Sequence, residues 1–184
     1  MASDQGLLRA TACAIVDKLN SGEVTPLDLL DVLEKRIAEV DGQVNALPTL
    51  CFDRARTRAK ALMKKTVGDR GPLAGMPIPI KDLTDVEGVL TTQGSPIYRD
   101  TIPARSDLVV EHLESSGGVI YAKSNTPEFG AGANTFNEVF GRTRNPWNTS
   151  CLSGSPRRGE RLAPDQLTPH HQHPTIIPHP AAPA

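Results

Sequence analysis

The sequence predicts an α/β fold in which helices precede a strand–helix–strand unit. Apolar residues recur at helical spacing in the first part of the chain, and two short apolar runs further on each end in a lysine. A stretch of helical length separates these runs and stops at Gly117-Gly118. Strand, helix and strand of these lengths favour parallel pairing in one sheet, with a right-handed crossover.

The first predicted helix covers about residues 4–20. Leu8, Ala12, Ile15 and Leu19 follow one another in steps of four, three and four, which places them on one helical face. The pair Ser21-Gly22 directly after them is typical of a helix end. One amphipathic helix is therefore expected at the amino end.

The second helix, near 26–41, has clear start signals. Thr25 is the expected N-cap, Pro26 suits the first helical position, and Asp28 completes a capping box. Gly42 is the expected C-cap. An apolar stripe on this segment predicts that the helix packs along one side.

Two further helices are predicted from composition and flanking signals. Residues 52–65 are rich in Ala, Arg and Lys, and the stretch RARTRAK within them reads as a solvated helix face rather than a nucleic-acid patch. Ser106 is the expected cap of the helix through LVVEHLESS, between the two apolar runs.

The apolar runs MPIPIK (76–81) and VIYAK (119–123) are predicted as buried parallel strands. Pro77 and Pro79 remove two backbone donors, so the first strand needs one side that is unpaired or irregular. In open α/β sheets, ligands bind at the carboxyl ends of the strands. Each run ends there in a lysine, so this edge is the candidate functional site.

Lys81 and Lys123 are the two strand-end lysines. A lysine buried among apolar neighbours loses hydration, so its pKa falls and its neutral amine can act as a general base. Alternatively, either side chain extends to solvent or pairs with a carboxylate such as Asp82. We expect Lys81 to face the rim of the sheet, away from bulk solvent, beside loop 91–95 or turn 124–127.

Composition excludes several functional classes. The net charge is −1 and 22 % of residues are charged, so no broad basic face predicts nucleic-acid binding. No apolar stretch approaches the ~18 residues of a membrane span, and the opening residues lack the pattern of a signal peptide. The three cysteines are far apart and outside any CxxC motif. A cytoplasmic protein with reduced thiols is expected.

The chain divides into residues 1–150, expected to fold, and a tail of residues 151–184. The tail's 34 residues hold seven of the 16 prolines and four of the five histidines, and no aromatic residue. Such a segment cannot bury enough apolar surface to offset its ordering entropy, so disorder is expected from about residue 152. The histidines of HHQH (His170, His171, His173) are accordingly expected to be solvated. No metal site and no cofactor are predicted.

Three blocks, GPLAGMPIPIKDLTDVEGVLTTQGSPIY, PARSDLVVEHLESSGGVIYAKSNTPEFGAGANTFN and GRTRNPWN, together resemble the amidase signature family. The resemblance implies an α/β/α fold around a mixed sheet. It also implies hydrolysis of small-molecule amides by a Ser–cis-Ser–Lys triad, without a cofactor. By motif, the lysine of IKDL is Lys81, the triad's base, whereas Lys123 matches no triad position. In that chemistry a neutral lysine draws a proton through a bridging serine from the nucleophile.

The sequence departs from the family after NPWN. A glycine-serine block resembling GGSSGGS is expected there, but only Ser153-Gly154-Ser155 stands in its place, followed by Pro156. The later block with the nucleophile is absent, which leaves Ser155 as a weak substitute. A truncated, catalytically incomplete amidase chain is the first interpretation, with a frameshift, a mis-joined exon or a prediction error as the source of the tail.

Two alternatives stay open beside the incomplete amidase. The chain is a non-catalytic binding or regulatory relic that keeps half of the substrate pocket, or it is a phosphate- or nucleotide-binding module. The absence of GxGxxG and GxxxxGK[ST] after either strand counts against the module. The residues point to no particular amide and to no oligomeric state. For this chain alone, we expect no amide hydrolysis and poor solubility.

Overall fold

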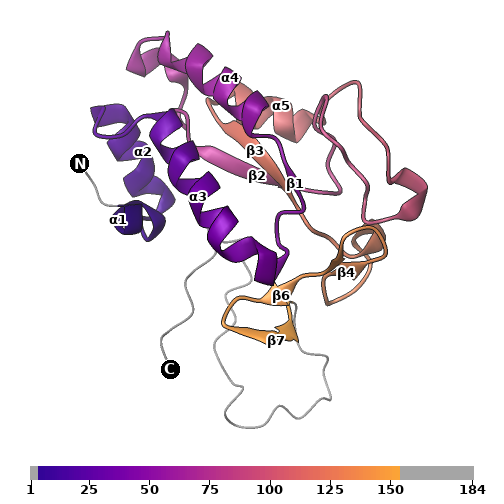
Figure 1. The fold of residues 1–184 in the computed structure, drawn as a ribbon. Coiled ribbons are helices and arrows are strands. Elements are labelled where there is room, and N and C mark those ends of the chain that lie inside the picture. The colour runs from indigo at the N-terminus through magenta and orange to yellow at the C-terminus, as the bar shows by residue number, and fades with distance from the viewer. Residues whose placement is uncertain (1–3, 154–184) are drawn as a thin grey trace.

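A three-stranded sheet lies between helices in the computed structural model, which describes residues 4–153 (Figure 1). The α-helices are α1 (Asp4–Leu8), α2 (Ala12–Ser21), α3 (Pro26–Val44), α4 (Phe52–Met63) and α5 (Leu108–Ser115), and the 3-10 helices are η1 (Val67–Arg70), η2 (Pro96–Tyr98) and η3 (Glu128–Gly130). The strands are β1 (Thr49–Leu50), β2 (Pro77–Lys81), β3 (Val119–Ser124), β4 (Phe136–Asn137), β5 (Gly141–Arg142), β6 (Arg144–Asn145) and β7 (Asn148–Leu152).

The single helix predicted over 4–20 is wrong, because α1 and α2 are separate helices. Thr11 lies between them in extended backbone, and its hydroxyl accepts a hydrogen bond from the Ala14 N–H at 3.2 Å. A threonine in this conformation is an N-cap, so a new helix begins after it. The predicted end is confirmed, since Gly22 caps α2 in the left-handed region, with φ 74°.

The start of α3 is confirmed as a capping box. The Thr25 hydroxyl accepts a hydrogen bond from the Asp28 N–H at 3.2 Å, and the Asp28 carboxylate accepts one from the Thr25 N–H at 2.8 Å. The predicted end at Gly42 is wrong. The helix continues to Val44, and Asn45, at φ 56°, caps it by donating its N–H to a carbonyl of the last turn.

The start of α5 also differs from the prediction. Ser106 does not cap the helix; its hydroxyl accepts a hydrogen bond from the Glu87 N–H at 2.9 Å. Asp107 stands at the N-cap, and its carboxylate accepts from the Asp85 N–H at 2.8 Å. Both side chains therefore tie the beginning of α5 to the loop after β2.

The predicted parallel pairing of the two lysine-ended strands is confirmed. β2 and β3 are parallel, and β1 pairs with β3 antiparallel, which gives the mixed order β1-β3-β2. β2 is an edge strand of this sheet, and its register with β3 is irregular between Ile78 and Pro79. An edge position tolerates residues that lack a backbone donor, as Pro77 and Pro79 do.

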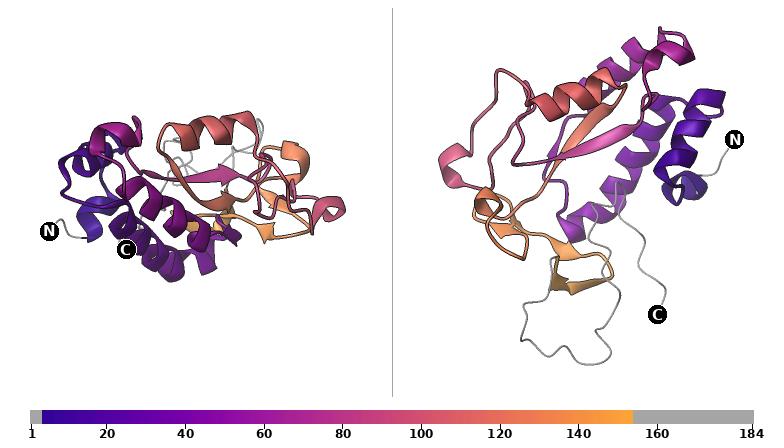
Figure 2. Two further views of the ribbon diagram at one scale, coloured as in Figure 1. Left: turned by 90° about the horizontal axis from the view of Figure 1, so that it is seen from above. Right: turned by 180° about the vertical axis from the view of Figure 1, so that it is seen from behind.

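Helices cover both faces of the sheet (Figure 2). On one face, α3 and α4 pack on β3; on the other, α5 packs on β2 and β3. The first cluster consists of Leu30, Leu33, Ile37, Leu47, Phe52, Ala55, Ala59, Leu62, Val119, Tyr121 and Ala122. The second consists of Ile80, Val86, Val89, Val110 and Ile120. A third cluster joins α1, α2 and α3 to the segment before β2.

The fold continues past the predicted boundary at residue 150. β6 and β7 form a hairpin that reaches Leu152, and Ser153 exchanges backbone hydrogen bonds with Thr135 and Thr143. The tail predicted to be disordered lies, from residue 154 onward, outside the described residues.

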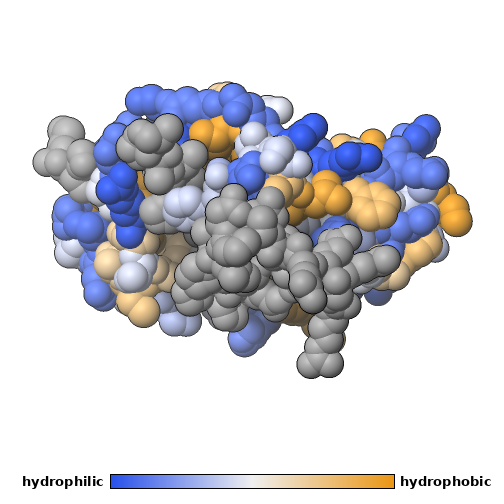
Figure 3. Space-filling model, turned by 90° about the horizontal axis from the view of Figure 1, so that it is seen from below, coloured by the Kyte–Doolittle hydropathy of each residue, from blue (hydrophilic) through white to orange (hydrophobic). Residues whose placement is uncertain are grey.

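Several large apolar side chains of the described residues are exposed. On the face in Figure 3, apolar patches interrupt a largely hydrophilic surface. The exposed set comprises Leu50, Val67, Ile97, Tyr98, Ile102, Leu108, Val109, Phe129, Phe136 and Trp147. Across residues 4–153, no helix has the length and apolar content needed to cross a bilayer.

Candidate functional site

The two strand-end lysines point to opposite faces of the sheet. Lys81 of β2 stands opposite Ser124 of β3, and Ile80 stands opposite Lys123. Successive residues of a strand point to opposite faces. Ile80 belongs to the cluster on the α5 face. Lys123 therefore shares that face, whereas Lys81 and Ser124 share the face of α3 and α4.

A bulge in β3 produces this arrangement. Ile78 pairs with Ile120, but the next residue, Pro79, pairs with Ala122, so Tyr121 is the extra residue. Tyr121 and Ala122 both pack in the cluster of α3 and α4, which breaks the alternation. A bulge re-aims the side chains that follow it. Here it turns Lys123 toward the loops beside α5.

Lys123 is completely buried and fully bonded. Its Nζ donates to the Thr91 hydroxyl at 2.7 Å and to the Thr84 carbonyl at 2.9 Å, and it lies 3.3 Å from a carboxylate oxygen of Asp82. Burial lowers the pKa of Lys123, and the charge of Asp82 opposes that change. The desolvation expected at Lys81 thus acts on Lys123 instead.

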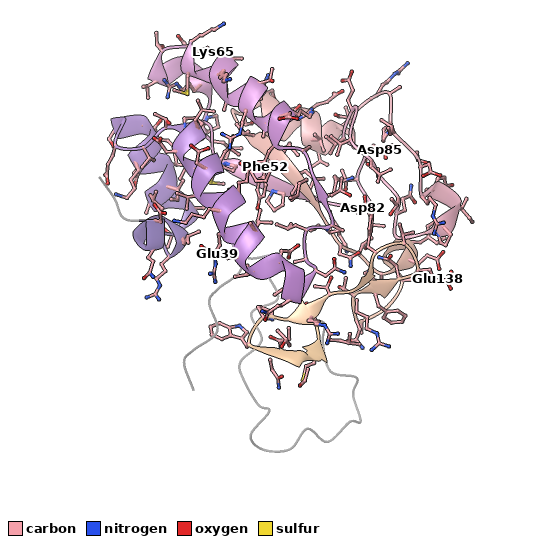
Figure 4. All side chains as sticks on the ribbon, viewed as in Figure 1. Glu39, Phe52, Lys65, Asp82, Asp85 and Glu138 are labelled. Carbon is pink, nitrogen blue, oxygen red and sulfur yellow. The ribbon has the colours of Figure 1, made fainter. Side chains whose placement is uncertain are left out.

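Asp82 is the acidic partner of this buried pair and is itself completely buried. Its carboxylate accepts a hydrogen bond from the Thr92 hydroxyl at 2.6 Å and from the Thr92 N–H at 3.2 Å. Figure 4 labels Asp82 close to where the chain leaves the sheet for the loops. The predicted alternative of a lysine paired with Asp82 is therefore confirmed for Lys123. The pair also holds loop 91–95 against the strand ends.

Lys81 has the predicted place but not the predicted environment. It ends β2 opposite Ser124, and the Asp82 N–H donates to the Ser124 carbonyl at 2.9 Å, so turn 124–127 is its neighbour. The expectation that its amine is withdrawn from solvent is wrong, since Lys81 is exposed. It ends an edge strand and faces away from the buried pair. Among residues 4–153, its amine has no hydrogen-bond or ion-pair partner.

A second polar cluster, which was not predicted from the sequence, makes the turn after β3 rigid. Asn137 donates its side-chain amide to Asn125 Oδ1 at 2.7 Å and to the Thr126 carbonyl at 2.8 Å. Asn125 in turn donates to the Thr143 hydroxyl at 3.0 Å. All four residues are buried. The polar residues that follow VIYAK could have indicated this cluster, because polar groups after a buried strand need hydrogen-bond partners.

The other predicted residues do not add to the site. Ser155 and the HHQH histidines lie outside the described residues. Within the described range no group of His, Cys, Asp and Glu could hold a metal ion. Burial raises the pKa of Cys51 to about 11, so this thiol stays protonated at neutral pH and is a poor nucleophile.

Comparisons with known proteins identify relatives of this chain. The chain is 37 % identical over 148 residues to a glutamyl-tRNA(Gln) amidotransferase subunit from Roseiflexus sp. (strain RS-1), covering 80 % of this chain and 30 % of that protein. It is 35 % identical over 158 residues to the protein of the same name from Geobacter sulfurreducens, covering 85 % and 33 %. The chain thus spans about a third of the length of these relatives.

Solved structures match the fold over a similar share. A bacterial aryl acylamidase of the amidase signature family superposes with a TM-score of 0.74 at 26 % identity, covering 79 % of this chain and 31 % of the other. A 6-aminohexanoate cyclic dimer hydrolase superposes with a TM-score of 0.72 at 28 % identity, covering 80 % and 30 %. The family model described as Amidase matches residues 28–155. The chain belongs to the amidase family.

Proposed function

We propose that this chain carries the lysine of an amidase-type site but does not hydrolyse amides by itself. The family assigns amide-bond hydrolysis as the ancestral chemistry, with a small-molecule amide as substrate. The observation that carries the proposal is the position of Lys81, exposed at the carboxyl end of β2 with no partner among residues 4–153. A lysine in this position is available to a bridging serine, as the triad requires.

The missing groups explain the expected lack of activity. Triad members act as a unit, and the loss of a nucleophile costs orders of magnitude in rate. No block resembling GGSSGGS follows NPWN, and Pro156 stands beside Ser155 where the block would have glycine. The backbone of Ser153 is held by Thr135 and Thr143, so this part of the chain is occupied as a strand extension.

The test is an assay of the purified chain on simple aryl and aliphatic amides, with a Lys81→Ala variant in parallel. We expect both proteins to show only the background rate. Lys81 is exposed and contributes no buried contact, so its replacement leaves the fold intact and the comparison is fair. Turnover by the native chain that disappears in Lys81→Ala would contradict the proposal.

A second candidate function is amide binding without hydrolysis. Buried polar groups around Asn125 hold the turn beside Lys81 in one conformation, which favours a preformed half-pocket. Titration of the labelled chain with acetamide or acetanilide, followed by NMR, tests this candidate. Binding predicts saturable shifts at turn 124–127 that Lys81→Ala weakens, and no shift there would exclude it.

Two expectations remain, one on the cellular compartment and one on phosphate binding. We propose a cytoplasmic setting with reduced thiols, because the three cysteines are far apart in sequence and outside any CxxC motif. The phosphate-binding alternative finds no support, because neither lysine-ended strand is followed by a glycine-rich phosphate loop.

A further inference from the structure

The structure pairs Lys81 with a hydroxyl that the family resemblance does not assign. Ser124 stands opposite Lys81 on the neighbouring parallel strand, on the same face of the sheet. Strands lie about 4.8 Å apart, so the two side chains begin within reach of one another. The bulge at Tyr121 is responsible, because without it Ser124 would point to the opposite face.

Both side chains are free to act together. The Ser124 hydroxyl is half-buried and, like the Lys81 amine, makes no hydrogen bond within residues 4–153. The nearest carboxylate in sequence, Asp82, is occupied by Lys123 and Thr92 on the opposite face. Lys81 is therefore not sequestered in an ion pair, and an exposed side chain changes rotamer within nanoseconds.

We propose that Lys81 and Ser124 form a Ser–Lys pair that activated aryl esters acylate. The inference rests on the proposed role of Lys81 as a base. The Ser124 Oγ attacks the ester carbonyl and forms a new C–O bond, while the hydroxyl proton passes to the neutral Lys81 amine. The bond to the aryl oxygen then breaks and the aryl oxide leaves. The acyl group remains as an ester on Ser124.

The surrounding backbone explains why this pair accepts aryl esters and not amides. The Asn125 N–H donates to the Ala46 carbonyl at 2.9 Å, and the Thr126 N–H donates to Asn125 Oδ1 at 3.0 Å. The turn after Ser124 thus has no free donors for an oxyanion, a stabilisation worth about 10²–10³ in rate. An aryl oxide leaves without that help and without protonation, whereas an amine does not.

The experiment treats the full chain with p-nitrophenyl acetate and follows both p-nitrophenol release and the acetylated peptides by mass spectrometry. We expect acetyl on Ser124 in the native chain, formed faster than on the exposed serines. Ser124→Ala removes this acetylation. Lys81→Arg keeps the positive charge but accepts no proton, and it slows Ser124 acetylation about 10²-fold.

Ser115→Ala is the matched control, since Ser115 is exposed at the end of α5 and donates only to the His112 carbonyl. This variant reacts like the native chain. Circular dichroism of each variant checks the fold, and Ser124→Cys, with a more nucleophilic thiol, reacts faster than the native chain. Acetylation of Ser124 no faster than that of Ser115, or unchanged in Lys81→Arg, would overturn the pair. Because amide turnover is assayed separately, this failure would leave the proposed function untouched.

Discussion

Lys81 and Lys123 end neighbouring parallel strands, one residue out of register, yet they occupy opposite environments. Lys123 is completely buried, bonded to two oxygens and next to Asp82, and burial lowers its pKa. Lys81 is exposed and has no partner in the described part of the chain. A single bulge in β3 separates the two cases, because it turns Lys123 to the face opposite Lys81, toward the loops beside α5.

The buried Lys123 contributes to the stability of the fold, whereas the exposed Lys81 is available to react. A buried charge must be paired, and the removal of one partner leaves the other uncompensated. The Lys123–Asp82 pair therefore belongs to the scaffold, where it holds loop 91–95 to the strand ends. Lys81 is not part of this buried pair, so its amine remains available to react.

Asp82→Ala should have the largest effect on stability. The variant leaves the ammonium group of Lys123 buried without a counter-charge, which costs about 3–5 kcal/mol in unfolding free energy. Urea unfolding measures the loss, and Asp17→Ala, which removes an exposed carboxylate of α2 that does not act on Lys123, is the control. An equal, small loss in both variants would show that the pair does not support the fold.

Thr92→Val should cost less, about 1.5–3 kcal/mol, because the hydrogen bond to the charged Asp82 and the one accepted from the Gly94 N–H are lost while the shape is kept. The Thr92 hydroxyl bonds the Asp82 carboxylate at 2.6 Å. Thr57→Val is a suitable control, since its exposed hydroxyl bonds only a carbonyl of its own helix. Unfolding curves of the two variants that coincide would contradict this ranking.

The dependence of the unfolding free energy on pH should show the lowered pKa of Lys123. Its pKa in the folded chain lies below the ordinary value of 10.5. Between these two values the unfolded chain holds a proton that the folded chain has released, so the unfolding free energy rises with pH. The rise amounts to about 1.4 kcal/mol for each unit that separates the two pKa values.

The matched protein for this test is the double variant Asp82→Asn/Lys123→Met, which leaves no unpaired buried charge. Its unfolding free energy, measured from neutral to alkaline pH, should lack the rise predicted for the native chain. Parallel profiles for the two proteins would mean that Lys123 titrates as an exposed lysine does.

Lys81→Ala should change stability least, by no more than about 0.5 kcal/mol, as is usual for an exposed side chain without partners. Thermal unfolding of the variant beside the native chain provides the measurement. A loss of stability comparable to that of Asp82→Ala would mean that Lys81 also supports the fold. The two lysines would then not differ in role.

Local features of the fold were predictable from the sequence. The capping box at Thr25 and Asp28 lies within four residues, so its chemistry can be read without the rest of the chain. The parallel pairing of β2 and β3 followed from the length of the connecting segment and the Gly117-Gly118 break. Gly117 in fact lies at φ 90°, where a Cβ would come within 2.0 Å of the Arg70 carbonyl oxygen.

Features that depend on distant contacts were not predictable. The start of α5 was misplaced because Ser106 and Asp107 bond backbone of the loop after β2. The bulge at Tyr121 could not be predicted from the apolar pattern, because both Tyr121 and Ala122 suit a buried face. The sequence therefore located both lysines at the correct edge of the sheet, but it predicted that Lys81 faces away from solvent, whereas Lys81 is exposed.

The most direct test of the contrast is the methylation rate of each lysine in the folded chain. Formaldehyde and a mild borohydride modify accessible amines, and mass spectrometry of the peptides gives a rate for every site. We predict that Lys81 reacts as fast as Lys60 of α4, which is also exposed, and that Lys123 reacts only when the protein unfolds. Methylation of Lys123 at the rate of Lys81 under native conditions would contradict the account.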